Sequence, residues 1–295
     1  SSEMRGWPKF DADNILYFEI GLMLLFLSMN ATDLILQNRG YYTQAGFFPV
    51  SSFLIPVFDS FSIETLYYME RSFWWLHIIG ILFFLNYLYY SKHLHILLAF
   101  PNTYYANLEE KGKFDILESV KNEVLLMFYP EKVQEENNAQ VEKFGASDVF
   151  DLNWIQLMNA YSCTECGRCT SECPANLTGK KLSPRKIMMD TRDRLEEVSK
   201  NISKNNGVFK DDGNQLLDNF ISREELWACT SCNACVDACP IDIDPLSIII
   251  RMRQYLIMEE SSAHSDLNNM MNNIENNGAP WPFNQQDREL WIQEP

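Results

Sequence analysis

Cys163-Thr-Glu-Cys166-Gly-Arg-Cys169-Thr-Ser-Glu-Cys173-Pro174 and Cys229-Thr-Ser-Cys232-Asn-Ala-Cys235-Val-Asp-Ala-Cys239-Pro240 are the two cysteine runs around which this chain is organised. Both have the spacing C-x2-C-x2-C-x3-C-P, and together they contain all eight cysteines of the 295 residues. A spacing that is repeated without change indicates the ligands of a metal centre rather than scattered structural thiols.

The spacing is that of the two-cluster ferredoxins, in which the fourth cysteine of each run ligates the other cluster. Thiolates at i, i+3 and i+6 of a tight loop wrap one corner of a [4Fe–4S] cluster, and the fourth cysteine, followed by proline, points away from its own loop. The spacing therefore predicts two ligand sets: Cys163, Cys166, Cys169 and Cys239 for a first cluster, and Cys229, Cys232, Cys235 and Cys173 for a second.

Two other uses of cysteine fit the pattern less well. Disulfides need an oxidising compartment and do not explain the repeated spacing. Structural zinc sites commonly use C-x2-C pairs, but four cysteines in this rhythm, ending in proline, are unusual for zinc. Cluster thiolates also imply residence on the reducing, cytoplasmic side of a membrane.

Composition divides the chain into unlike parts. Residues 14–100 are rich in Leu, Phe, Tyr and Trp, and the rest is acidic. The net charge of −16 argues against nucleic-acid binding. No nucleotide loop or nucleophile triad is found, so no catalytic residue is predicted. We expect a mainly α protein with transmembrane helices followed by an α-helical ferredoxin domain. Its parts are a membrane region (1–108), an acidic linker (109–146), the cluster domain (147–262) and a partner-docking or disordered tail (263–295).

Two membrane spans are predicted, at about residues 14–37 and 72–99, the second ended by Pro101. The positive-inside rule puts the N-terminus and the cluster domain in the cytoplasm. The polar residues of the first span fall on one stripe, which should face protein rather than lipid. Hydrogen bonding between helices is the favoured explanation, and contact with a quinone or a haem propionate is the alternative. These residues are Glu19, Asn30, Asp33 and Gln37.

Two of the four histidines suggest a second cofactor. His77 and His95 are 95 − 77 = 18 residues apart. On one continuous helix this is five turns, so both point the same way, about 27 Å apart. This separation suits two stacked b-type haems, and interfacial histidines without a metal are the alternative. His93 fits the haem arrangement poorly.

Ser91-Lys92-His93-Leu94-His95, followed by Ala99-Phe100-Pro101-Asn102, resembles a motif in membrane-bound relatives of heterodisulfide reductase. Their membrane part is similar to the gamma subunit of respiratory nitrate reductase, and the resemblance implies that His77 and His95 are haem ligands. In that family the opposite ligands are histidines of an earlier membrane helix, whereas no histidine precedes His77 here. Because Ser1-Ser-Glu-Met-Arg5 is also unlike a natural start, we expect the chain to begin inside a longer protein.

Residues 150–262 contain helix signals that small β-rich ferredoxins lack. Helices are predicted at 151–161, from Ser183-Pro184 to Ser203, and from Asp244-Pro245 to about Glu260, with a capping box at Ser222 and Glu225. This arrangement resembles the α-helical ferredoxin domains found in the iron–sulfur subunits of heterodisulfide reductase and glycolate oxidase, and in the C-terminal half of the succinate dehydrogenase iron–sulfur subunit. The resemblance implies a place in an electron relay.

The resemblance also implies a partner: a separate redox subunit with Cys-Cys-Gly repeats, or a flavoprotein, docked through Trp281 and Trp291 of the tail. We therefore expect an electron-transfer subunit of a bacterial inner membrane, working between a cytoplasmic redox partner and membrane haem b or quinone. Further membrane helices are expected as partners. The competing hypotheses are a structural or redox-sensing component of a cell-envelope assembly, and a soluble oxidase subunit with an incidental anchor.

Overall fold

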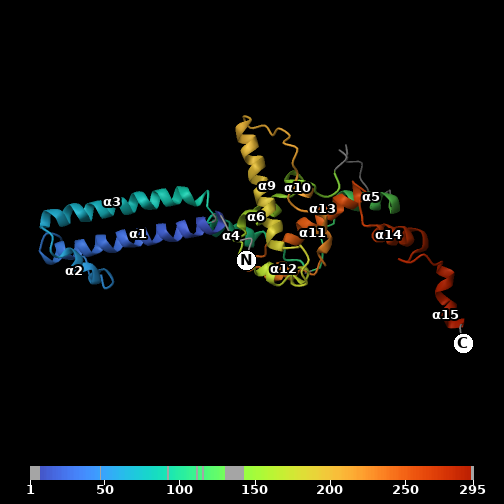
Figure 1. Ribbon diagram of the computed structural model, residues 1–295, viewed down its shortest axis with the longest axis horizontal. Coiled ribbons are helices and arrows are strands. Elements are labelled where there is room, and N and C mark those ends of the chain that lie inside the picture. Colours follow the sequence, from blue (N-terminus) through green and yellow to red (C-terminus); the bar gives the residue numbers. More distant parts are fainter. Residues whose placement is uncertain are drawn as a thin grey trace. The chain divides into compact units, whose positions relative to one another are not determined.

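The computed structural model describes residues 7–46, 48–91, 93–110, 112–114, 116–129 and 143–293. Within these ranges the protein is mainly α, as predicted. The described residues form no strand, and their β-type pairing is an isolated bridge between Leu217 and Ile221. The chain divides into two compact units, Ser1–Leu97 and Leu98–Pro295 (Figure 1). Residues 130–142 of the predicted acidic linker lie outside the described residues.

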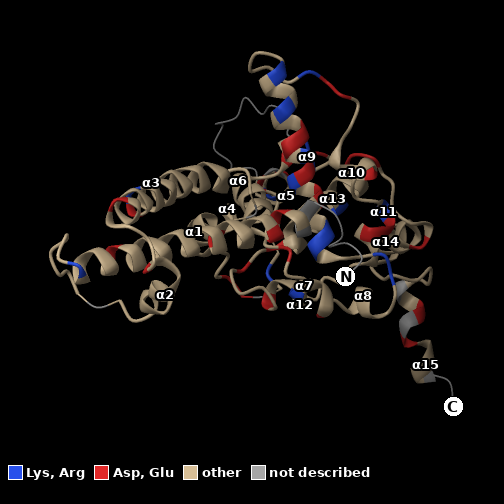
Figure 2. Ribbon diagram, turned by 60° about the vertical axis from the view of Figure 1, so that its left-hand side comes forward, with Lys and Arg blue, Asp and Glu red and all other residues tan. Residues whose placement is uncertain are grey.

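The first unit is a pair of long apolar helices, α1 (Trp7–Asn38) and α3 (Ile63–Leu88), joined through η2 (Ser51–Leu54) and α2 (Ile55–Phe58). Phe18 of α1 stacks between the rings of Phe83 and Phe84 of α3, each 5.5 Å away. The segments Phe10–Asn38 and Ile63–Leu88 are long and apolar enough to cross a membrane, with mean hydropathies of 1.6 and 1.2. Most of both helices is drawn tan, without charged residues, in Figure 2.

The polar stripe of α1 is largely turned inward within this unit. Asn30 and Gln37 are buried. The amide of Gln37 donates to Asp33 at 2.6 Å, and its oxygen accepts the backbone N–H of Ala45 at 3.0 Å. Glu19 is exposed and lies 3.7 Å from the imidazole of His93. These contacts run within α1 or to segments outside helices, so hydrogen bonding between helices stays a prediction for the stripe.

The prediction of one helix through residues 72–99 is wrong. Helix α3 ends at Leu88, and a separate helix, α4, spans Leu94–Tyr104 with Pro101 inside it rather than after it. Ser91 explains the break, because its hydroxyl donates to the Leu88 carbonyl at 3.2 Å and accepts the His93 N–H at 3.2 Å. Such local side-chain bonds compete with the helical ladder.

The second unit is built from helices whose starts follow local signals. The cluster domain contains η4 (Val149–Asp151), α6 (Trp154–Ser162), α7 (Arg168–Ser171), α8 (Pro174–Leu177), α9 (Pro184–Lys204), α10 (Leu216–Asn219), α11 (Arg223–Ala228), α12 (Ala234–Asp237) and α13 (Pro245–Met258). Helix α5 (Glu118–Phe128) precedes it, and α14 (Ser265–Asn277), η5 (Gln285–Glu289) and α15 (Leu290–Gln293) follow. The predicted helices after Ser183-Pro184 and Asp244-Pro245 are confirmed.

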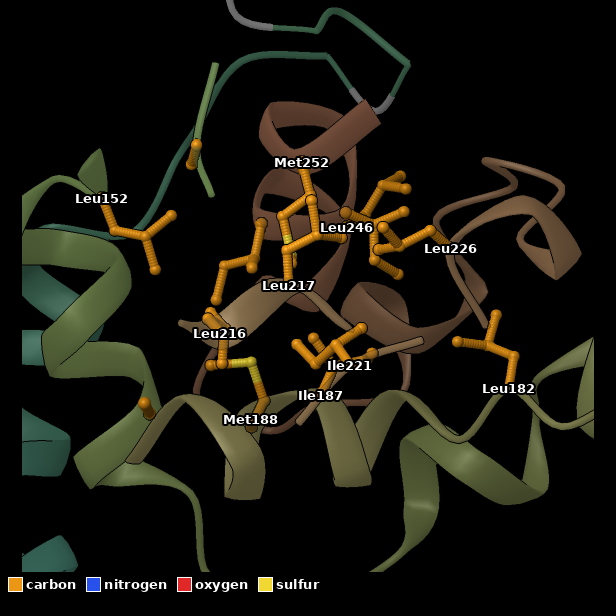
Figure 3. Close-up of a cluster of buried hydrophobic side chains, with 14 of the residues drawn as sticks. Leu152, Leu182, Ile187, Met188, Leu216, Leu217, Ile221, Leu226, Leu246 and Met252 are labelled. Atoms are coloured by element: carbon orange, nitrogen blue, oxygen red, sulfur yellow. The ribbon is translucent and has the colours of Figure 1, made fainter. Parts of the chain in front are cut away.

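The core of this unit lies between α9 and α13 (Figure 3). Ile187 and Met188 of α9 face Leu246 and Met252 of α13, and the turn around Leu217 fills the space between them. Gly145 fixes the entry to the domain. At φ +81° it lies so close to α13 that an added Cβ would stand 2.3 Å from the Tyr255 backbone nitrogen.

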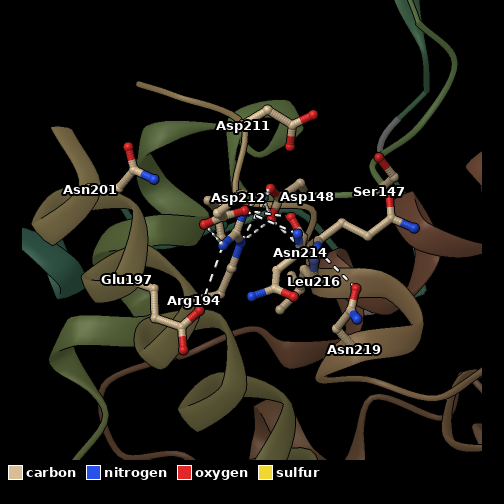
Figure 4. Close-up of polar contacts among 12 residues, drawn as sticks. Ser147, Asp148, Arg194, Glu197, Asn201, Asp211, Asp212, Asn214, Leu216 and Asn219 are labelled. Atoms are coloured by element: carbon tan, nitrogen blue, oxygen red, sulfur yellow. Dashed lines mark hydrogen bonds and ion pairs between the residues drawn. The ribbon is translucent and has the colours of Figure 1, made fainter. Parts of the chain in front are cut away.

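A fully buried arginine joins α9 to two loops (Figure 4). Arg194 donates through Nη2 to Asp148 at 2.9 Å and to the Asn214 carbonyl at 2.6 Å, and through Nη1 to Asp212 at 2.7 Å. Asp148 also accepts the Leu216 N–H at 3.1 Å. One side chain thus satisfies two carboxylates and holds both loops against the core.

Replacing this arginine should destabilise the domain strongly. Arg194→Gln leaves two carboxylates without their cation, which typically costs about 3–5 kcal/mol in a buried network. The matched change Arg223→Gln removes solvent-accessible ion pairs with Asp218 and Glu260, each of which is typically worth about 1 kcal/mol or less. Thermal unfolding followed by circular dichroism compares the two variants. Equal losses in both would show that the Arg194 network contributes little.

Candidate metal centre

Each cysteine run begins at the end of a capped helix. In α6, Asn153 and Gln156 form a capping box, and the helix ends at its C-cap, Cys163. In α11 the predicted capping box of Ser222 and Glu225 is present, and the C-cap is Cys229. The first cysteine of each run therefore stands at a fixed helix end.

The residues after these cysteines adopt the left-handed conformation at matching positions. Glu165 (φ 59°) and Ser231 (φ 55°) lie two residues after the first cysteine, and Gly167 (φ 82°) and Asn233 (φ 61°) lie four residues after it. These turns aim backbone N–H groups at sulfur. The N–H of Ser231 donates to Cys229 Sγ at 3.4 Å, and that of Glu165 donates to Cys163.

The later cysteines lie on and just after two short helices that contact each other. Cys169 belongs to α7 and Cys235 to α12. Cys173 and Cys239 follow these helices, each directly before a proline. All eight cysteines are free thiols. The second of each run, Cys166 and Cys232, is exposed, whereas Cys173 and Cys235 are buried.

Cys173 of the first run shares a cavity with cysteines of the second. This cavity is lined by Cys173, Cys229, Cys232 and Cys235, and it is closed by apolar side chains that include Leu182, Leu246 and Ile249. Around the other set, Cys169 interacts electrostatically with Cys166 and with Cys239 of the second run. Each run therefore has the fourth cysteine of the other run among its neighbours.

The chemistry of these thiols fits an iron–sulfur cluster. Burial raises the pKa of Cys163 to about 12 and that of Cys235 to about 12. When no metal is bound, neither water nor the nearby N–H groups fully compensate the negative charge of a thiolate at these positions. Iron supplies that compensation, and metal binding releases the protons. Among the described residues, no group of three or more His, Cys, Asp or Glu side chains could hold a single metal ion.

Two arginines, which the sequence did not single out, lie beside the first cysteine of each run. Arg192 of α9 interacts with Cys163, and Arg253 of α13 interacts with Cys229. Glu165, in the first run, is buried and pairs with Arg192 at 2.7 Å. Comparing the two halves of the sequence would have found these arginines, because each lies at the same distance from a helix-starting proline.

The chain that follows the second apolar helix contacts the cluster domain. Asn102, at the end of α4, is buried and donates to the Ile241 carbonyl at 2.8 Å, two residues after Cys239. The ring of Tyr105 packs edge-on against Trp154 of α6 at 4.8 Å. These contacts lie against the segments that carry Cys239 and Cys163.

The histidines do not have the arrangement that the sequence predicted. His77 lies on α3 and His95 on α4, so the five turns of one helix do not separate them. Nδ1 of His77 lies 3.0 Å from the Leu22 carbonyl, an arrangement that leaves Nε2 available to a metal. His93 and His95 are adjacent, with ring centroids 6.0 Å apart.

The tail carries exposed aromatic side chains. Trp281 and Trp291 are exposed to 50% and 73%. Helices α14 and α15 show that the described part of the tail has regular structure, where composition alone left disorder open.

Comparison with known proteins agrees with the cysteine pattern. A family model described as a 4Fe-4S dicluster domain matches residues 162–243. The chain is 30% identical to the probable iron-sulfur-binding oxidoreductase FadF of Bacillus subtilis, over 97% of this chain and 42% of that protein. It is 26% identical to the EtfAB:quinone oxidoreductase of Syntrophomonas wolfei (80% and 33%), and 28% identical to a probable membrane-anchored ferredoxin of Chromohalobacter salexigens (50% and 24%). No solved structure matches.

The chain spans less than half the length of these three relatives. It is also similar to several heterodisulfide reductase subunits. The protein therefore carries a dicluster domain for two [4Fe–4S] clusters, and it is an iron–sulfur electron-transfer protein related to oxidoreductase subunits.

A charged network ties α9 to the helix that presents Cys229. Lys186 of α9 contacts Asp190 at 2.7 Å and Glu225 of α11 at 2.9 Å. Burial raises the pKa of Asp190 to about 6, although Lys186 acts in the opposite direction. The folded state therefore holds this proton more tightly than the unfolded state, and stability falls as pH rises from about 4 to 6.

Asp190→Asn should stabilise the protein above pH 6. The amide avoids the cost of ionising a buried carboxyl, a gain of about 1–3 kcal/mol that should vanish near pH 4. Thermal unfolding between pH 4.5 and 8 measures it, with the exposed change Asp266→Asn as the control. A variant less stable at every pH would mean that the contact with Lys186 outweighs the cost of burial.

Proposed function

We propose that this protein is a membrane-anchored electron-transfer subunit that passes electrons through two [4Fe–4S] clusters, between a cytoplasmic redox partner and quinone in a bacterial inner membrane. The observation that carries the proposal is the cavity in which Cys173 meets Cys229, Cys232 and Cys235. It supports crossed ligation: these four cysteines hold one cluster, and Cys163, Cys166, Cys169 and Cys239 hold the other.

When bound, each cluster supplies a one-electron carrier. The chain's own residues keep the first cysteine of each run at a helix end, direct N–H groups at its sulfur and pack Cys163, Cys173, Cys229 and Cys239 against the domain core. Cys166 and Cys232 alone are exposed among the eight, so they mark where electrons enter and leave the two sets. No bond-making step is assigned to this chain.

The proposed electron transfer between the clusters and the membrane is supported by the segment that follows the candidate membrane spans in the sequence. Asn102 in the last turn of α4 and Tyr105 just after it contact the segments that carry Cys239 and Cys163. The Cys163 set is therefore the set nearer, along the chain, to the candidate spans. A similar protein is named a quinone oxidoreductase. Haem b remains part of the proposal: His77 is the better placed ligand because its Nδ1 faces a carbonyl, and His95 is the second candidate.

The cytoplasmic partner is proposed to be a cysteine-rich redox subunit of the Cys-Cys-Gly type, or a flavoprotein. A dihydromethanophenazine:CoB–CoM heterodisulfide reductase subunit of Methanosarcina mazei is among the proteins similar to this chain. Trp281 and Trp291 are the proposed docking residues, because large aromatic side chains left exposed often mark interfaces.

Cys173→Ser tests the ligand sets. It should damage the cluster held by Cys229, Cys232 and Cys235, while the cluster of its own run keeps its signal. Cys239→Ser is the reciprocal variant and should damage the other cluster. Iron content and paramagnetic resonance of the purified, reduced protein distinguish the two. Loss of the first run's cluster on changing Cys173 would refute crossed ligation.

Membranes that contain the full chain test the relay. Addition of a quinol should reduce the clusters reversibly and rapidly, seen as bleaching of their visible absorbance. The same spectra should show a b-type haem band that disappears in His77→Ala. Clusters that a quinol cannot reduce in the folded protein would favour a structural or sensing role.

A further inference from the structure

The two halves of the cluster domain place an arginine at the same position. Arg192 lies 192 − 184 = 8 residues after Pro184, which starts α9, and Arg253 lies 253 − 245 = 8 residues after Pro245, which starts α13. Each reaches the residue two positions after the first cysteine of a run. That residue is Glu165 in the first half and Ser231 in the second.

In the first half this contact is a buried ion pair. Nη2 of Arg192 lies 2.7 Å from Oε1 of Glu165, whose side chain is 0% exposed, while the arginine is 13% exposed. Both groups interact electrostatically with Cys163. The carboxylate cancels the charge of the arginine, so the pair adds no net charge beside the first cysteine set.

In the second half the arginine has only neutral partners. Arg253 donates through Nη2 to the carbonyls of Leu226 at 2.6 Å and Cys229 at 2.5 Å, and through Nη1 to the Ser231 hydroxyl at 3.2 Å. Its guanidinium carbon lies 5.1 Å from the ring centre of Trp227. Within the described residues no carboxylate forms an ion pair with it, so one positive charge remains beside Cys229.

We propose that Glu165 and Ser231 set the order in which the two cysteine sets accept an electron, the Cys229 set before the Cys163 set. The proposal rests on the proposed function, because it assumes one [4Fe–4S] cluster in each set. On reduction, one electron passes from the donor to cluster iron, and no bond is made or broken. The added negative charge is favoured beside an uncompensated arginine and less favoured beside a neutral pair.

Other determinants of potential also differ between the halves. Backbone N–H groups two residues after the first cysteine reach sulfur in both halves, and each run has one exposed cysteine at the same position. The Cys229 set is the more buried one, because it includes the buried Cys173 and Cys235, and the Thr170 hydroxyl bonds to Cys169 whereas its counterpart Val236 has no hydroxyl. Both differences favour reduction of the Cys163 set, so the proposed order requires the charge difference at Glu165 and Ser231 to outweigh them.

Exchange of the two residues tests the proposal. The purified full chain with both clusters is titrated anaerobically with dithionite, and each step is followed by paramagnetic resonance. The native protein should show two separate one-electron steps. Ser231→Glu should shift the upper step to lower potential, and Glu165→Ser should shift the lower step to higher potential. The double exchange should reverse the order of the signals.

Control variants distinguish the effect of a charge beside the cysteines from the effect of the net charge of the protein and from loss of a cluster. Ser203→Glu, at an exposed position of α9, and Glu196→Ser, at a half-buried position that pairs with Lys200, make the same changes of charge and should move neither step. If an exchange variant loses iron, two further variants test the effect of charge. Arg253→Gln should shift the upper step to lower potential. The double variant Glu165→Gln with Arg192→Gln removes both charges of the pair and should leave the lower step in place. Two intact clusters whose steps ignore these changes, or move oppositely, overturn the inference. Fewer than two clusters in the native protein would instead overturn the proposed function.

Discussion

Several cysteine sulfurs, among them those of Cys163 and Cys235, lie where a bare thiolate is unstable, and this constraint governs the architecture of the second unit. Burial raises the pKa of Cys163 and of Cys235 well above the ordinary value of a thiol. Deprotonation there needs positive charge, from iron and to a smaller degree from N–H groups and arginines. The capping boxes, left-handed turns and proline-started helices all serve to hold such groups at fixed places around sulfur.

The sequence predicted this part of the fold well because its signals are local. Ser183-Pro184, Asp244-Pro245 and the Ser222–Glu225 box each start a helix through contacts within one turn, so neighbours elsewhere in the chain are not needed. Crossed ligation, which was also inferred from spacing, stays a proposal. The pairing of Arg194 with Asp148 and Asp212 was not predicted, because it joins segments 46 and 18 residues apart in the chain, which no short pattern records.

The break between α3 and α4 shows the opposite case. Residues 84–97 contain Asn86 and the run Ser91-Lys92-His93 among apolar residues, and hydropathy alone does not distinguish a helix end from a polar interruption of a continuous helix. Ser91 is buried, and its hydroxyl bonds on both sides of the break. Pro101 lies inside the helix that follows. The haem argument from His77 and His95 depended on unbroken helical geometry, and it weakened where that geometry failed.

The repetition of the two halves also shows where selection for function is visible. Capped helix ends, left-handed residues, prolines and arginines recur at matched positions, so the fold itself requires them in both halves. A difference at a matched position is not required by the fold, since the other half forms the same loop without it. Glu165 and Ser231 share a backbone conformation and an arginine partner, yet differ by one charge. The Glu165 carboxylate pairs with Arg192, and the proposed consequence of its absence from the other half is a difference in how readily the two cysteine sets accept an electron.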